Sequence, residues 1–389
     1  MRQLPDKTQP WRPHNRFEMI EQGKNFFPAM LEAIAGARVA VALEIYWMET
    51  GRLTERFIQA FTAAAGRGVQ VYLLIDDFGS ADLDPIDRRR LATAGVVLAR
   101  YNPLGVRRGR ANLMRDHRKL LLIDGTTAFV GGTGLSDVFD GDAGWRETML
   151  RIEGECVGDW WNLFADTFNR WSVAPCQPPV VSPVGATPGQ MLPGRHKRRR
   201  PLMAQTLAAI ARARERVWLV TPYFLPPARL RRALARARRR EVDVRVLVPA
   251  PRMCDLPAVH AAGRRYYDPL LRRRLRLYEF QPRVLHQKVL LADDRVLVGS
   301  SNFDRWGLRW HLEADQAVSS ASLAEAIASM LERDFRASRE LTLADWRQRS
   351  WPARWREWFW GWVERQACEV AFRRRVARTA RRQRRGGRT

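Results

Sequence analysis

Short apolar runs rich in β-branched residues alternate along the chain with stretches of helical periodicity. Residues 38–46 and 69–75 have the pattern of buried strands, and residues 53–67 between them have the pattern of a helix. Two further apolar runs, residues 96–99 and 118–123, follow in the same half. This alternation predicts an α/β fold in which a mixed, mainly parallel sheet is flanked by helices.

The second half of the chain repeats this order. The matching segments are residues 215–223, 228–240, 242–248, 275–280 and 289–292. The copies are 169 residues apart, measured from His117 to His286. That period is too long for a solenoid and predicts two lobes related by a pseudo-twofold axis.

Changes in composition suggest where the lobes begin and end. We predict an N-terminal lobe over residues 1–173 and a C-terminal lobe over residues 202–340. Residues 174–201 are rich in Pro and Gly and end in a basic run, which is typical of a linker. Residues 341–389 form a tail rich in Trp and Arg.

Length and composition exclude several classes of protein. The 389 residues, 46% of them hydrophobic, are enough for about two domains with buried cores. Four widely spaced cysteines do not make a disulfide scaffold, and no CxxC or HxxxH pair indicates a zinc site. No apolar run approaches the ~20 residues of a membrane span, and residues 1–19 lack the apolar core of a signal peptide. We therefore expect an intracellular protein, either soluble or bound at a membrane surface.

The formal net charge of +26 predicts an anionic partner. Nucleic acid and an acidic lipid leaflet both fit this charge. Lys is scarce, with five residues among 67 basic ones. A Lys at a repeated position therefore indicates that a compact ammonium group is needed there, rather than a guanidinium.

Each half carries the same polar residues beside its last apolar run. His117, Lys119 and Asp124 precede the turn Gly131-Gly-Thr-Gly134, and His286, Lys288 and Asp293 precede the turn Gly299-Ser-Ser-Asn302. Side chains two residues apart in a β-strand point to one face. A pseudo-twofold axis would then bring both His-Lys pairs to a single interface.

These residue types suit chemistry on a phosphodiester. Lys119, Lys288, Ser300, Ser301 and Asn302 could bind the non-bridging oxygens and the charge that develops in the transition state. One His can attack phosphorus to form a phosphohistidine while the other protonates the leaving oxygen. An alcohol could then accept the phosphoryl group without ATP. We expect no cofactor and no metal.

The paired H-x-K-x4-D motifs with their GG and GS turns resemble the phospholipase D superfamily. Within it the chain is similar to the bacterial cardiolipin synthases, closest to the B type, from about Glu18 to Asp334. The resemblance implies two phospholipase D-like lobes with one active site at their interface. It makes His117 the nucleophile and His286 the general acid and then base.

The resemblance also assigns supporting residues. It implies that Glu147 orients His286 and that Glu313 orients His117, each from the opposite lobe. Asp124 and Asp293 would support the motifs, and the turn residues Gly132 and Thr133 would join the phosphate site.

Two positions depart from the family pattern. Gly134 stands where the first motif normally has Asn, and His311 stands where an Asn commonly precedes the Glu. We expect altered activity or specificity rather than its loss.

The tail repeats apolar residues at helical spacing beside a strongly basic end. The apolar positions are Trp355, Trp358, Phe359, Trp362, Val363 and Val370. This pattern favours a helix lying in the lipid headgroup region. The alternative is a helix that packs its Trp face onto its own domain.

Three functions fit these observations. The first is cardiolipin synthesis, in which a phosphatidyl group passes between two phosphatidylglycerol molecules at the cytoplasmic face of the bacterial cell membrane. The second is a phospholipase D-type hydrolase or an HKD nuclease, with water as acceptor. The third is an inactive protein that binds membranes or nucleic acid. We favour the first, with phosphatidylglycerol rather than nucleic acid as partner. The acceptor alcohol, the His that attacks first and the oligomeric state stay open.

Overall fold

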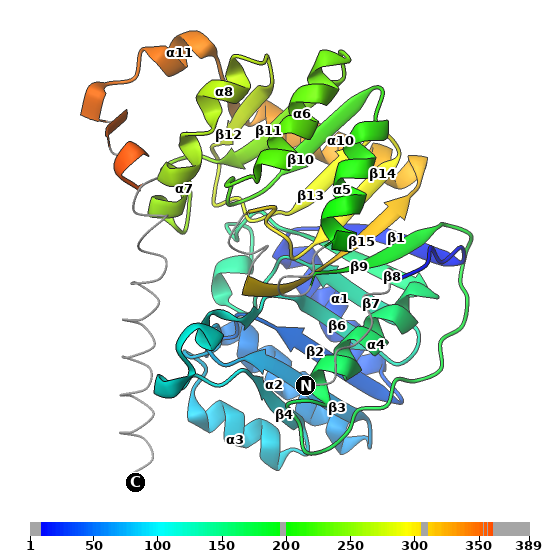
Figure 1. Cartoon of the computed structure of the whole chain (residues 1–389). Helices are drawn as coiled ribbons and strands as arrows, with labels where there is room; N and C mark the ends of the chain where they lie inside the picture. The colour runs from blue at the N-terminus through cyan, green and yellow to red at the C-terminus, as the bar shows by residue number, and fades with distance from the viewer. Residues whose placement is uncertain (1–8, 195–199, 305–309, 353, 356, 361–389) are drawn as a thin grey trace.

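The chain folds into two stacked β-sheets with helices around them (Figure 1). The structure is a computed structural model and describes residues 9–194, 200–304, 310–352, 354, 355 and 357–360. The lower sheet in Figure 1 comes from the first half of the chain, and the upper sheet comes mainly from the second half. The halves therefore form two lobes.

The first sheet has the strand order β1-β8-β7-β6-β2-β3-β4. Its strands are β1 (Asn15–Glu21), β2 (Ala40–Ile45), β3 (Gln70–Asp76), β4 (Val97–Tyr101), β6 (Lys119–Ile123), β7 (Thr127–Gly131) and β8 (Thr148–Gly154). The helices of this half are α1 (Gly23–Gly36), α2 (Arg52–Gly66), α3 (Pro85–Thr93) and α4 (Cys156–Phe168), with 3-10 turns η1 (Val106–Leu113) and η2 (Asp137–Phe139).

The second sheet has the order β16-β12-β11-β10-β13-β14-β15, and β15 also pairs with β9 and with the short β5. Its strands are β5 (Arg115–Asp116), β9 (Gly189–Gly194), β10 (Arg216–Val220), β11 (Asp243–Pro249), β12 (Arg276–Phe280), β13 (Val289–Ala292), β14 (Arg295–Gly299), β15 (His311–Ser319) and β16 (Ser338–Leu341). The helices of this half are α5 (Arg200–Arg212), α6 (Ala228–Arg239), α7 (Pro257–Arg264), α8 (Tyr267–Leu271), α10 (Ala321–Arg336) and α11 (Leu343–Arg347).

The two sheets follow one plan, which confirms the predicted repeat. The run β8-β7-β6-β2-β3-β4 corresponds strand by strand to β15-β14-β13-β10-β11-β12. Both sheets are mixed, as expected, but the expectation that they are mainly parallel is wrong. Parallel pairing within each repeat is confined to β2-β3-β4 and β10-β11-β12, whereas β6-β7-β8 and β13-β14-β15 are antiparallel. Parallel strands need a long crossover, and the connection between β6 and β7 is only residues 124–126.

The predicted linker, residues 174–201, is too long. Residues 189–194 form β9, which pairs antiparallel with β15 just as β1 pairs with β8. The Gly and Pro content of this segment suggested a linker, yet Met191 and Leu192 are buried in the core. The second repeat therefore begins with β9.

The lobes share an apolar core that fixes their relative position. One continuous cluster joins Trp160 and Phe164 of α4 to Ile327 and Leu331 of α10, together with one face of each sheet. Every residue of β2 is buried, which explains its apolar pattern apart from Glu44. The shared core holds the two lobes together through one face of each sheet. The candidate site lies at the interface between the lobes.

The first part of the predicted tail belongs to the C-terminal lobe instead. Leu341 ends β16, which pairs with β12, and Trp346 is buried with its ring 5.1 Å from that of Tyr267. Trp362, Val363 and Val370 lie outside the described residues. Across the described part of the chain, no helix has the length and apolar character to cross a bilayer.

Candidate active site

Each motif histidine is anchored by the backbone of the opposite lobe. His117 follows β5, which pairs with β15, and its N–H donates to the carbonyl of Leu312 at 2.9 Å. In the other half a bridge joins Leu285 to Arg146, and the N–H of His286 donates to the carbonyl of Arg146 at 2.9 Å. These two backbone pairings between the lobes are equivalent, so the fold brings both histidines to the lobe interface in the same way.

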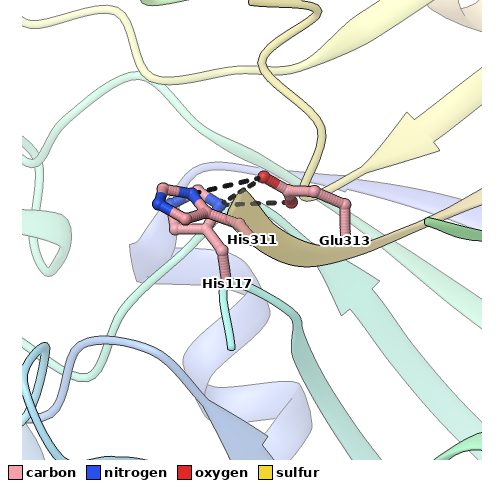
Figure 2. A group of neighbouring side chains, drawn as sticks. All are labelled: His117, His311 and Glu313. Atoms are coloured by element: carbon pink, nitrogen blue, oxygen red, sulfur yellow. Dashed lines mark hydrogen bonds and ion pairs between the residues drawn. The ribbon is translucent and has the colours of Figure 1, made fainter. Parts of the chain in front are cut away.

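Each histidine also meets a glutamate from the opposite lobe. His117 Nδ1 lies 3.1 and 3.2 Å from the two carboxylate oxygens of Glu313 (Figure 2), and His286 Nδ1 lies 2.8 Å from Oε2 of Glu147. All four residues are buried. A carboxylate can only accept, so it favours a proton on Nδ1 and leaves the lone pair on Nε2. These pairings match the predicted orienting residues.

The two lysines lie beside the histidines. Lys119 and Lys288 each donate from Nζ to the carbonyl of the motif histidine two residues earlier, at 2.5 Å. Lys288 Nζ is also 2.9 Å from His286 Nδ1 and 3.6 Å from Glu147. A Cβ on Gly132 would lie 2.8 Å from Lys288 Nζ and 2.4 Å from Glu147 Oε2. Gly132 therefore allows the turn to approach these charged groups closely.

Burial shifts the protonation of all four basic groups. Burial, reinforced by Lys119 and Lys288, lowers the pKa of His117 well below 6.5. Burial and Lys288 lower the pKa of His286 as well. Burial lowers the pKa of Lys119 to about 7 and also lowers that of Lys288. The imidazoles are therefore neutral near pH 7, and a bound anion would favour the charged lysines.

The two serines of the second turn make hydrogen bonds within their own lobe. Ser300 Oγ donates to Glu313 at 2.5 Å, and its N–H donates to the carbonyl of Ala314. The N–H of Ser301 donates to Asp315 at 3.1 Å. These donors hold the turn and Glu313, so the Ser300 hydroxyl is already engaged, and a phosphate contact of Ser301 would come from its hydroxyl group.

The other predicted phosphate ligands differ in their surroundings. Thr133 Oγ1 donates to the carbonyl of Gly134 at 3.0 Å. Asn302 is buried, and its side-chain oxygen has no hydrogen-bond partner among the residues that the structure describes. This atom is an acceptor, so a phosphate contact of Asn302 would have to come from its amide nitrogen.

Asp124 and Asp293 lie at the far ends of β6 and β13 from the histidines. Asp124 accepts hydrogen bonds from the N–H groups of residues 38–40, and Asp293 accepts them from those of residues 214–216. A five-residue strand such as β6 spans about 16 Å, so neither carboxylate reaches the histidines. Their hydrogen bonds join the ends of β6 and β13 to the backbone at the starts of β2 and β10.

Two tyrosines beside the motif histidines and one buried aspartate were not predicted from the sequence. The ring of Tyr46 lies 4.9 Å from that of His117, and the ring of Tyr223 lies 6.4 Å from that of His286. The two tyrosines follow equivalent strands, so the repeat itself could have revealed them. Asp315 lies behind the second turn, where burial and Glu313 raise its pKa to about 8.

Three side chains of the site could hold a metal ion. His117, His311 and Glu313 each place a ligand atom within 4.8 Å of the others (Figure 2). Two imidazoles and a carboxylate are ligand types that zinc accepts. Glu313 already accepts from His117 and Ser300, so a cation would have to displace these hydrogen bonds.

Comparison with known proteins assigns the family. The family model described as "Cardiolipin synthase, PLD-like domain" matches residues 30–164 and 206–336. The chain belongs to this family. It is 31% identical to cardiolipin synthase A of Pseudomonas putida over 350 residues, which is 86% of this chain and 71% of the relative. Cardiolipin synthase A of Pseudomonas aeruginosa is 31% identical over 346 residues, covering 86% and 70%.

Solved structures with low identity support the fold. A phosphatidylserine synthase of Haemophilus influenzae has a TM-score of 0.75 at 12% identity, covering 93% of this chain and 96% of that one. A polyphosphate kinase of Porphyromonas gingivalis has a TM-score of 0.60 at 16% identity, covering 85% and 49%. The chain is thus an enzyme of the phospholipase D superfamily, and its family indicates phospholipid substrates. The relatives above carry the A-type name, and the finer likeness to the B type stays a prediction.

Packing explains why this family member has Gly134 in place of Asn. A Cβ there would lie 2.9 Å from the carbonyl oxygen of Trp47 and 3.2 Å from its Cβ. Gly134→Asn should therefore destabilise the fold by about 1–3 kcal/mol, through overpacking, rather than restore a phosphate ligand. Thermal denaturation measures this, with Gly36→Asn as control because no atom lies within 4 Å of a Cβ at Gly36 and its φ is not positive. A Gly134→Asn protein that is as stable as wild type and more active would contradict this account.

Proposed function

We propose that the protein is a cardiolipin synthase that transfers a phosphatidyl group from one phosphatidylglycerol to the hydroxyl group of a second, releasing glycerol. The observation that carries the proposal is the reciprocal pairing of His117 with Glu313 and of His286 with Glu147 across the lobe interface. Two oriented imidazoles beside two buried lysines suit a double displacement at phosphorus.

In the first step His117 attacks phosphorus. With Nδ1 directed at Glu313, the lone pair on Nε2 forms the P–N bond, and the bond from phosphorus to the glycerol headgroup breaks. His286, which takes up a proton when the anionic phosphodiester binds beside it, gives this proton to the leaving glycerol oxygen. Lys119 and Lys288 neutralise the charge on the non-bridging oxygens.

In the second step the roles of the groups reverse. His286, now neutral, takes the proton from the hydroxyl group of the second phosphatidylglycerol, whose oxygen attacks phosphorus. The P–N bond breaks and His117 is restored. Cardiolipin forms, and every proton lost by one group is gained by another. No cofactor takes part in either step.

The pKa values predict the pH dependence of kcat/KM, which reports the free enzyme. His117 must be neutral, and because its pKa is depressed, the acid limb should lie below pH 6.5. His286 and Lys119 must be protonated, so activity at low substrate should fall as the pH rises through the depressed pKa of His286 and then through about 7 for Lys119. The bound phosphate raises the lysine pKa, so kcat should persist to higher pH. A kcat/KM that stays flat from pH 6 to 9 would contradict this assignment.

A lipid assay tests the proposed function directly. Purified protein is incubated with phosphatidylglycerol vesicles in EDTA without nucleotide, and the lipids are analysed by mass spectrometry. Cardiolipin with an equal amount of glycerol is expected. Phosphatidic acid alone would indicate a hydrolase, and cleavage of DNA with unchanged lipids would indicate a nuclease.

The tail supports contact with a membrane surface. Trp351, Trp355 and Trp358 are 74%, 52% and 65% exposed, whereas Glu357 on the same segment is buried and accepts a hydrogen bond from Arg264 at 2.9 Å. The buried carboxylate attaches the segment to the C-terminal lobe and leaves indole rings outward, where Trp favours the lipid headgroup region. We propose that the protein binds peripherally at the cytoplasmic face of the cell membrane.

Replacing the three exposed tryptophans should weaken membrane binding. Trp351→Ser, Trp355→Ser and Trp358→Ser together should lower partitioning into phosphatidylglycerol vesicles by about tenfold or more, because the apolar area inserted is lost. Sedimentation with vesicles measures the effect. The control replaces exposed Ile86, Val173 and Val180 by Ser. Equal binding of both triple variants would rule out these tryptophans as the anchor.

A further inference from the structure

A groove lined by arginines lies between α6 and α8 in the C-terminal lobe, away from the motif histidines. It has a volume of about 460 Å³. Its cationic lining is Arg231, Arg232, Arg236, Arg239 and Arg273, and Leu270 is among its apolar lining residues. Grooves of this size commonly hold a small ligand.

The charge of this groove is not shared by the other repeat. Helix α2 occupies the position in the first lobe that α6 occupies in the second, between the first and second parallel strands. Within α2, Arg52 and Arg56 are paired with acidic groups of residues 137 and 140. Helix α6 has six arginines and no acidic residue. The two repeats share a fold and differ in this surface, so the fold does not require it.

The groove arginines are not neutralised within the protein. No ion pair joins any of the five to a carboxylate in the part of the chain that the structure describes. Arg231 stacks on Tyr266 at 4.5 Å, and Arg273 donates to the carbonyl of Pro269 at 2.6 Å, which leaves both with further N–H donors. Arg232, Arg236 and Arg239 are exposed. Converging guanidinium groups are suited to the oxygens of a phosphate.

We infer that this groove binds the glycerophosphate headgroup of an anionic phospholipid, separately from the catalytic site. Charge complementarity favours a phosphate, and the accessible Ala228 and Pro269 suit the adjoining glycerol carbons. A concave groove on one helix pair fits a single headgroup better than an extended nucleic acid strand, which needs a longer basic track.

The groove is also next to the proposed membrane-binding segment. Its wall α8 packs against α11 through Tyr267 and Trp346, and the exposed tryptophans at 351, 355 and 358 follow directly. Figure 1 shows α6, α8 and α11 together at one end of the C-terminal lobe. The inference rests on the proposed function only in taking the ligand from a membrane.

The test compares two triple variants with the same change in charge. Arg232→Gln, Arg236→Gln and Arg239→Gln remove the groove cations, and Arg38→Gln, Arg89→Gln and Arg170→Gln remove exposed cations of the other lobe. Binding is measured by sedimentation with vesicles of phosphatidylcholine containing 30% phosphatidylglycerol. Each arginine near an anionic surface contributes about fivefold, so the groove variant should bind on the order of 100-fold more weakly, and the control should bind nearly as wild type.

Two results would overturn the inference. One is equal vesicle binding by the groove variant and the control. The other is a groove variant that keeps its vesicle binding and loses binding to DNA, which would make the groove a nucleic acid site. Turnover of short-chain phosphatidylglycerol below its micelle concentration should be unchanged in the groove variant. This assay separates a failure of the inference from a failure of the proposed function, which would appear as inactivity of the wild type.

Discussion

Replacing His117 by alanine should reduce turnover of phosphatidylglycerol by about 10⁴-fold or more, because the proposed covalent intermediate forms on this side chain. His117 Nδ1 is held by Glu313, and its Nε2 is the atom assigned to attack. Loss of cardiolipin formation is measured by lipid mass spectrometry. His14→Ala serves as control, since His14 is exposed and lies outside the site.

Stability must be separated from chemistry in this variant. Glu313 is buried and would lose one hydrogen-bond partner, although Ser300 remains. His117→Asn keeps a polar group near Glu313 and should be equally inactive with a thermal midpoint closer to wild type. Wild-type turnover in either variant would remove His117 from the role of nucleophile.

Replacing Lys288 by methionine should lower kcat/KM by about 10²–10³-fold, the usual loss when one preorganised donor to the transition state is removed. Lys288 is buried, and its Nζ contacts His286 and approaches Glu147 and the Gly132 backbone. Methionine preserves the length of the side chain and removes its charge. Lys24→Met is the matched control, because Lys24 forms an exposed ion pair with Asp142.

Arginine should not rescue the Lys288 position. A guanidinium is larger than an ammonium, and the space around Nζ is too tight for a Cβ at Gly132. Lys288→Arg should therefore stay at least tenfold below wild type in kcat/KM. Full activity of the arginine variant would show that only charge is needed there. It would contradict the inference that this position requires a compact ammonium group.

Much of this fold could be predicted because its strands are buried on both faces. The apolar runs at residues 69–75 and 289–292 became β3 and β13 within a residue of the predicted limits. Strand β9 was missed because its sequence, Gly-Gln-Met-Leu-Pro-Gly, combines turn residues with buried ones. The parallel character was overestimated because apolar patterns do not reveal the direction of a neighbouring strand.

The site was predictable as far as the repeat extends. The His, Lys and Asp residues could be predicted because they recur in both halves of the chain. Glu147 and Glu313 were predicted from the family resemblance. The roles of Ser300 and Asp315 depend on contacts between β14 and β15 that no local pattern encodes. The arginine groove also needed the structure, because Arg273 follows α8, a helix that the sequence pattern did not predict.

The central claim is covalent transfer through His117, and one measurement tests it most directly. Protein mixed with phosphatidylglycerol is quenched in alkali within milliseconds to seconds and digested, and the peptides are analysed by mass spectrometry. The account predicts a phosphatidyl adduct on the peptide that carries His117, and no such adduct in His117→Asn. An adduct on His286, or cardiolipin formed at full rate with no adduct on either histidine, would contradict it.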